Sequence, residues 1–207
     1  TQAETQHSAS PDKLQQAIKE LTKRALEFQS DKPLIFVIGE NGFNLALSLG
    51  IQKQFIIKTG NWVGPLLVAA AENGIKEVLL FGYHGKLIKL AGGIFHTHHH
   101  LADGRLEVLA ALAVRLGLPL KKIKLLLKAE SLEAAFLYLQ SKNPEMADEL
   151  WKFLADQVEI KSTAYIRRYG SWSIKVGAAL FDRQRKLRWL GALGHQQLLA
   201  SGVTLGS

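Results

Sequence analysis

The sequence has no cysteine among its 207 residues, which excludes disulfide bonds and thiolate metal sites. The same absence is expected of a cytoplasmic protein. No apolar run approaches the roughly 20 residues that a membrane-spanning helix needs, so no membrane partner is expected. The polar residues 1–10 lack the apolar segment of a secretory signal peptide. We expect these residues to form a disordered or truncated tail.

Acidic residues are the minority charge, because 18 Asp and Glu stand against 26 Lys and Arg and leave a formal net charge of +8. Such an excess favours a polyanionic partner: a nucleic acid, an anionic membrane, or a small molecule with several carboxylates or phosphates. Hydrophobic residues make up 47% of the chain, enough for a real core, and this excludes a disordered chain. The length fits one ordinary domain with a small appendage.

Short apolar runs alternate with helical patterns in the first half of the chain. Residues 33–38, 55–57 and 78–81 are predicted as strands, and the first of these runs is apolar throughout, as in a strand buried on both faces. Residues 43–49 and 66–73 are predicted as the intervening helices. This alternation predicts an α/β fold with a mostly parallel, doubly wound sheet and helices on both faces.

The second half of the chain has a different pattern. Residues 104–116, 131–140 and 144–157 have helical periodicity, whereas residues 173–181 and 187–193 alternate like the two strands of a hairpin. We therefore expect a helical segment followed by a C-terminal strand pair. The predicted organisation is a tail over residues 1–10, an α/β ligand-binding core over 11–130, and a helical segment plus hairpin over 131–207 that packs on the core.

Glycine-containing turns follow each of the three predicted core strands, at residues 39–44, 59–64 and 82–86. Because ligands bind beyond the carboxyl ends of parallel strands, these turns should line one continuous cleft. A Gly-x-x-Gly turn is also a common chain reversal, and the spacing matches neither the dinucleotide fingerprint nor the P-loop. The helix N-termini can still bind a carboxylate or a ribose hydroxyl. The pattern therefore favours a nucleoside-type cofactor that has no pyrophosphate.

Residues 82–107 concentrate titratable groups that packing does not require. His84 lies in the third turn and, with an ordinary pKa near neutral, is the best-placed general acid or base, although a core histidine with one hydrogen bond is the alternative. Lys86 and Lys89 lie beside glycines, which favours close approach of an anion over the usual solvated lysine. Asp103 either handles protons or caps the helix that follows.

The histidine run after this turn invites a metal-site interpretation. His96, His98 and His100 would share one side of an extended segment, and imidazole suits zinc, cobalt or nickel. Adjacent histidines such as His98 and His99 strain to meet one metal, however, and no carboxylate stands at ligand spacing before Asp103. We therefore predict no metal site and keep a metal-binding protein as an alternative.

These residues resemble the CbiD family, the cobalt-precorrin-5B C-1 methyltransferases of cobalamin biosynthesis. The resemblance runs through residues 60–64, 82–93, 97–98 and 102–107, and more loosely from residue 10 to residue 183. It implies transfer of a methyl group from S-adenosylmethionine to C-1 of a cobalt corrinoid, giving cobalt-precorrin-6A on the anaerobic route; cobalt enters only as part of the substrate. Family members usually carry a further N-terminal region, so the chain resembles their C-terminal part.

The resulting hypothesis is a methyltransferase whose cleft is formed by the three turns. A corrinoid with several carboxylates suits a basic protein, with the basic runs 121–124, 167–168 and 183–188 as candidate rims. Positioning alone can supply effective molarities on the order of 10⁵ M, and one base suffices for a proton. In this hypothesis His84 or Asp103 handles protons; Gly39, Gly42, Gly60, Asn61 and Gly64 contact adenosylmethionine; and Gly85, Lys86, Lys89, His98 and Arg105 face the corrinoid.

The sequence leaves two further alternatives open. The chain can be a truncated, non-catalytic module that binds a corrinoid or adenosylmethionine, or a subunit of a split enzyme. It can also be a basic nucleic-acid binder, although no recognised DNA- or RNA-binding motif is present and no nucleic acid is expected as a partner. A homo-oligomer or a missing N-terminal region also stays open.

Overall fold

The structure of the protein is a computed structural model that describes residues 11–27, 32–98 and 103–204, so the prediction for residues 1–10 lies outside it. Its strands are β1 (Leu34–Ile38), β2 (Ile56–Lys58), β3 (Glu77–Tyr83), β4 (Lys175–Phe181) and β5 (Leu187–Leu190). They form one sheet in the order β2-β1-β3-β4-β5. The first four strands are parallel and β5 is antiparallel to β4. The register pairs Phe36 with Ile57 and Leu80, and Leu80 with Ala178.

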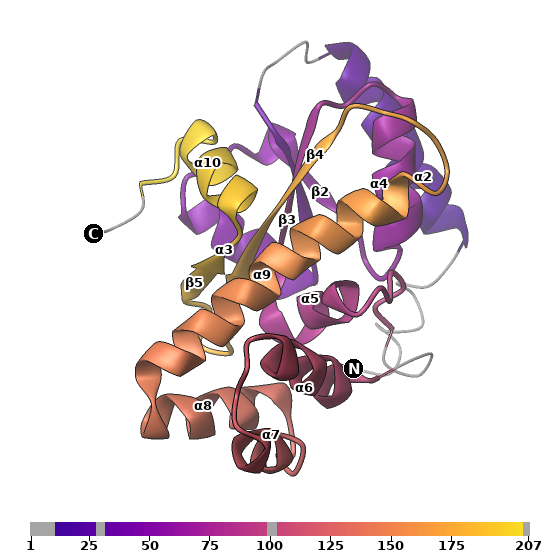
Figure 1. The fold of residues 1–207 in the computed structure, drawn as a ribbon. Helices are drawn as coiled ribbons and strands as arrows, with labels where there is room; N and C mark the ends of the chain where they lie inside the picture. Colours follow the sequence, from indigo (N-terminus) through magenta and orange to yellow (C-terminus); the bar gives the residue numbers. More distant parts are fainter. Residues whose placement is uncertain (1–10, 28–31, 99–102, 205–207) are drawn as a thin grey trace.

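Helices cover both faces of the sheet. On one face lie α3 (Glu40–Ser48) and α10 (Ala192–Ala200); on the other lie α5 (His84–Ala91) and the long α9 (Pro144–Ile166), which crosses the strands (Figure 1). The remaining helical elements are α2 (Pro11–Glu27), η1 (Lys53–Phe55), α4 (Val63–Glu72), α6 (Arg105–Arg115), α7 (Leu120–Leu126) and α8 (Leu132–Lys142). Within the described ranges, no helix is long and apolar enough to cross a membrane.

Polar caps fix where α8 and α9 begin. Ser131 Oγ accepts a hydrogen bond from the backbone N–H of Ala134 at 3.1 Å, and Asn143 Oδ1 accepts one from Met146 at 3.1 Å. Pro144 occupies the first turn of α9, where its missing N–H leaves no bond unmade. The Ser131 cap places Glu133 in the first turn of α8, a position that matters for the site described below.

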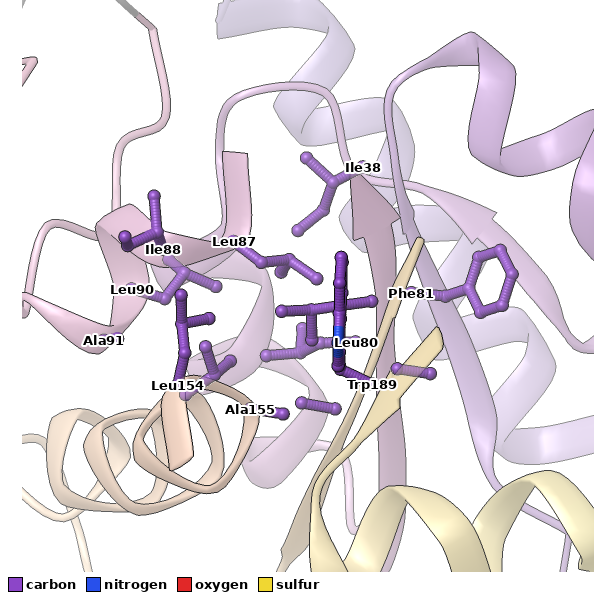
Figure 2. Close-up of a cluster of buried hydrophobic side chains, with 14 of the residues drawn as sticks. Ile38, Leu80, Phe81, Leu87, Ile88, Leu90, Ala91, Leu154, Ala155 and Trp189 are labelled. Atoms are coloured by element: carbon purple, nitrogen blue, oxygen red, sulfur yellow. The ribbon is translucent and has the colours of Figure 1, made fainter. Parts of the chain in front are cut away.

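The main core lies between the sheet and the pair α5 and α9. Figure 2 shows Leu80 of β3 and Ile38 of β1 beside Leu87 of α5 and Leu154 of α9, and each of these side chains is at most 1% exposed. Burying one such side chain contributes about 1.5–3 kcal/mol. Phe81 points to the opposite face of the sheet (Figure 2). This layer fixes the start of α5 relative to the carboxyl ends of β1 and β3.

The predicted fold class is confirmed, including the antiparallel strand pair at the C-terminus. β4 also continues the parallel sheet beside β3. Its residues 176–181 are all buried, as expected of a strand that is covered on both faces. The structure adds α7 and α10, which the periodicity did not predict, and α9 continues to Ile166 instead of ending at residue 157. The division into segments 11–130 and 131–207 stays a prediction.

Candidate functional site

A cavity of about 1200 Å³ opens at the carboxyl ends of β1, β2 and β3. The strand order reverses between β1 and β3, and this reversal is the place where doubly wound sheets bind their ligands. The helices α3, α4 and α5 each begin at the turn after one of these strands. The lining residues are Lys13, Leu14, Gln16, Ala17, Glu20, Gly39, Glu40, Lys58, Thr59, Gly60, Asn61, Trp62, Leu66, Tyr83, Gly85, Lys86, Lys89, Thr97, His98, Asp103 and Arg105.

The turn after β1 brings Gly39 against the side chain of Lys86. Gly39 has a φ of 92°, which L-residues with a Cβ rarely adopt. A Cβ built on Gly39 would lie 3.5 Å from Lys86 Nζ, so the ammonium group lies close to the end of β1. Gly42 is not among the lining residues: a Cβ there would lie 2.8 Å from Val37 Cγ1. This glycine lets α3 pack on the sheet.

The turn after β2 is held by the segment that follows α5. Asn61 Oδ1 accepts a hydrogen bond from Thr97 Oγ1 at 3.0 Å, and Thr97 N donates to Asn61 O at 3.1 Å. Gly60 and Asn61 line the cavity, whereas Gly64 does not: a Cβ on Gly64 would lie 2.7 Å from Tyr165 Oη. Gly64 therefore serves the packing of α4. The structure brings the second turn and residues 97–98 together, as one continuous cleft requires.

Two lysines of α5 contribute positive charge to the cavity. Lys89 is 2% exposed and its Nζ donates to Thr97 O at 3.3 Å. Burial lowers the pKa of Lys89, while the nearby Asp103 carboxylate raises it. Burial also lowers the pKa of Lys86, and among the described residues no carboxylate pairs with this ammonium. A half-buried cation without a counter-charge favours an anionic ligand.

Asp103 and Arg105 form a fork-shaped pair at the cavity edge. Arg105 Nε donates to Asp103 Oδ1 at 2.6 Å and Nη2 to Oδ2 at 2.9 Å. This hydrogen bonding lowers the pKa of Asp103 to about 2, so the carboxylate is a weak base at neutral pH. The residue before α6 is Gly104, with no side-chain cap. Asp103 therefore orients Arg105, and capping is not its role.

His84 faces the interior and is absent from the cavity lining. Its side chain is 0% exposed, its Nδ1 accepts a hydrogen bond from Trp151 Nε1 at 2.8 Å, and its Nε2 lies 2.6 Å from Glu133 Oε2. Because an indole N–H only donates, Nδ1 must be unprotonated and Nε2 must carry the hydrogen. Burial lowers the pKa of His84, against the raising effect of Glu133. The arrangement matches the alternative of a hydrogen-bonded core histidine.

Tyr83 is one of the lining residues that the sequence argument passed over. Its hydroxyl lies 3.4 Å from Glu133 Oε2, and burial followed by Glu133 raises its pKa to about 12. A Cβ on Gly85 would lie 2.4 Å from Tyr83 Cε1, so the tyrosine ring requires glycine at that position. The signal available in the sequence was the Tyr-x-Gly spacing at the end of a strand.

Of the two histidines of the run that the structure describes, His98 lines the cavity and His96 does not. The rings of His96 and His98 lie 6.4 Å apart, and the ring of His96 meets Trp62 edge-on at 4.7 Å. In the part of the chain that the structure describes, no group of three or more His, Cys, Asp or Glu could hold a metal ion. His99 and His100 lie outside the described residues.

A second hollow of about 710 Å³ lies beside β5 and the start of α10. Its cations are Lys152, Lys186 and Arg188, so one of the three predicted basic rims borders this hollow. None of the residues in those rims lines the larger cavity. The positive charge of the larger cavity comes instead from α2, β2, α5 and the start of α6.

Comparison with known proteins identifies the family. The model of the family described as "CbiD, C-terminal domain" matches residues 96–191. The chain is 59% identical over 204 residues to the "Cobalt-precorrin-5B C(1)-methyltransferase" of Prochlorococcus marinus strain MIT 9313, covering 99% of this chain and 53% of that protein. The chain belongs to the CbiD family. The proteins of the same description from P. marinus NATL2A and Synechococcus sp. CC9902 are 53% and 55% identical, over 99% and 95% of this chain and 54% of each relative.

This CbiD-family chain spans about half the length of the curated relatives it matches. The family model covers His98, Asp103 and Arg105. The relatives align over nearly the whole chain and so also cover the glycine turns and the lysines of α5. No solved structure matches the chain.

Proposed function

We propose that this chain forms the ligand-binding part of an S-adenosylmethionine-dependent methyltransferase that acts on C-1 of cobalt-precorrin-5B and yields cobalt-precorrin-6A in anaerobic cobalamin biosynthesis. The relatives' description as cobalt-precorrin-5B C(1)-methyltransferases supports this activity. The observation that carries the proposal is the convergence of the turns at Gly39, Asn61 and Gly85 on one cavity of about 1200 Å³. A cavity for one drug-sized ligand measures roughly 300–1,000 Å³, so this one has room for a methyl donor beside part of a macrocycle.

In this proposal the methyl donor lies against the turns after β1 and β2. Gly39 and Gly60 have positive φ values of 92° and 57°, which turn their backbones at the start of α3 and before α4. With no Cβ, both permit close approach of a ligand, and the exposed N–H groups of helix N-termini suit the donor's carboxylate and ribose. Asn61 is already oriented by Thr97. Gly42 and Gly64 act on this site indirectly, by seating α3 and α4.

The corrinoid lies against the cationic side of the cavity. The positive charge on this side comes from Lys86, Lys89 and Arg105, and it suits a substrate with several carboxylates. His98 lines the cavity on the same side. Lys86 is the strongest candidate for a direct ion pair, because its half-buried ammonium has no acidic partner among the described residues. Gly85 keeps the Tyr83 ring in place and therefore shapes this wall. Asp103 holds the Arg105 guanidinium in one orientation.

The bound sulfonium donor supplies an activated methyl group, so the chain's residues have to position the reactants and exclude water. Well-oriented reactants reach effective molarities on the order of 10⁵ M or more. The hydrogen-bonded turn at Asn61 and the buried start of α5 suit this role. Proton removal needs one base in addition, and neither Asp103 nor His84 suits it. Asp103 is too weak a base, and both ring nitrogens of His84 are engaged.

Calorimetry on this chain tests the proposal, with S-adenosylhomocysteine and cobyrinic acid, a stable cobalt corrinoid with free carboxylates, as probes. We expect both to bind. Lys86→Met should weaken cobyrinic acid binding about 10-fold or more, the worth of one charge-assisted hydrogen bond. The matched control Lys121→Met, at an exposed lysine outside the cavity, should bind like the wild type. Equal binding by the two variants, or no binding of either probe by the wild type, would contradict the proposal.

A further inference from the structure

A chain of four polar side chains leads from the cavity wall into the protein. Trp151 Nε1 donates to His84 Nδ1 at 2.8 Å, His84 Nε2 lies 2.6 Å from Glu133 Oε2, and Tyr83 Oη lies 3.4 Å from the same oxygen. Trp151 and His84 are 0% exposed and Glu133 is 7% exposed. Tyr83 alone of the four lines the cavity. These four residues are called the relay below.

The chemistry of the groups fixes the direction of every hydrogen bond in the relay. The indole of Trp151 can only donate, so His84 accepts at Nδ1 and donates from Nε2. Glu133 Oε2 accepts from His84 and from the hydroxyl of Tyr83. All hydrogens therefore point toward the carboxylate of Glu133, which is the member of the relay able to take up a further proton.

We propose that Tyr83 and Glu133 accept the proton that the corrinoid releases during methyl transfer, an inference that rests on the proposed function. When the substrate gains a methyl group as a cation, it must release one proton to keep its charge. In the proposed step the substrate's bond to that hydrogen breaks, and its electron pair stays with the substrate. The proton bonds to Tyr83 Oη while the phenol's own proton moves to Glu133 Oε2, leaving a neutral carboxylic acid. No oxidant or reductant takes part.

Other features of the site support this route. The pKa of Tyr83, raised to about 12 by burial and by Glu133, keeps the phenol protonated at neutral pH, as a group that passes a proton onward requires. Its ring is seated over Gly85, where a Cβ would lie 2.4 Å away. The charges that act on Tyr83 are those of Glu133, Arg183 and Arg105. His84 and Trp151 are positioning residues, because they touch Glu133 or its partner and lie away from the cavity.

Steady-state kinetics of the natural full-length protein test the route with Tyr83→Phe, Glu133→Gln and the double variant. Loss of general base catalysis lowers rates about 10²-fold or more, so each single variant should lose that much in kcat. The double variant should lose no more than either single one, because both substitutions break one step. Binding of S-adenosylhomocysteine should stay within about twofold of wild type, which separates a proton role from loss of the fold. The matched control is Tyr138→Phe, which should keep full turnover. Tyr138 is 39% exposed and lies on α8, the helix that carries Glu133.

A second readout does not depend on turnover. NMR titration of Tyr83, assigned by its loss in Tyr83→Phe, should give a pKa about 12 in the wild type and a lower one in Glu133→Gln, because the Glu133 charge raises it. An unchanged Tyr83 pKa, a Tyr83→Phe kcat within about threefold of wild type, or additive losses in the double variant would overturn the relay. An inactive wild type would instead overturn the proposed function itself.

Discussion

The strand-end cavity and the aromatic cluster around His84 begin at neighbouring residues of one turn, yet they differ in how their polar groups are satisfied. In the cavity, Lys86 is a partly buried cation without an acidic partner among the described residues. In the cluster, both nitrogens of His84 are hydrogen-bonded, and the rings of Trp151 and Trp189 lie 6.0 and 5.3 Å from it. The difference teaches that a titratable residue can belong to the core while its neighbours in the sequence line a cavity.

The largest effect expected from this comparison is on stability, at His84. His84→Ala would leave the Trp151 N–H and the Glu133 carboxylate buried without their partner and would open a void among the aromatic rings. We expect a loss of about 3–5 kcal/mol in the free energy of unfolding, measured by urea denaturation.

The matched control for this prediction is His195→Ala, at an exposed histidine of α10, which should change stability by less than about 0.5 kcal/mol. If His84→Ala were as stable as this control, the assignment of His84 to the core would be wrong.

A smaller effect, and one of opposite sign, is expected at Lys86. Burial lowers the pKa of Lys86 below its ordinary value of 10.5, so the unfolded chain binds this proton more tightly than the folded one. Stability of the wild type should therefore rise as pH increases from the lowered folded pKa toward 10.5. Lys86→Met lacks this titration and should be the more stable protein at neutral pH.

Urea denaturation at several pH values checks this prediction. The quantity to follow is the difference in the free energy of unfolding between Lys86→Met and the wild type. The stability advantage of Lys86→Met over the wild type should shrink as the pH approaches 10.5. Lys121→Met, at an exposed lysine, should show no such trend. A gap that stayed constant with pH would mean that the Lys86 ammonium is solvated in the folded protein.

The sequence was enough to predict the three strands β1, β2 and β3 and the turns that follow them. Apolar runs identified β1, β2 and β3, and parallel strands must present their carboxyl ends at one edge. This is why Gly39, Asn61 and Lys86 line one cavity as expected. The helix α10 was missed because residues 192–200 mix small, polar and apolar side chains without a clear helical stripe.

What the sequence could not supply were contacts between distant segments. Tyr83 and Glu133 are 50 residues apart, and the tertiary fold, in which α8 packs on α9, brings them together. Likewise Gly42 and Gly64 resemble ligand-binding glycines in the sequence, but Val37 and Tyr165 occupy the space that their missing side chains would fill. Local patterns do not report which neighbour a glycine accommodates.

The most direct test of the central claim is a crystal structure of this chain with S-adenosylhomocysteine. The account predicts the ligand in the cavity of about 1200 Å³, against the turns at Gly39 and Gly60 and within reach of Asn61. A ligand found instead in the hollow of about 710 Å³ beside β5 would contradict it.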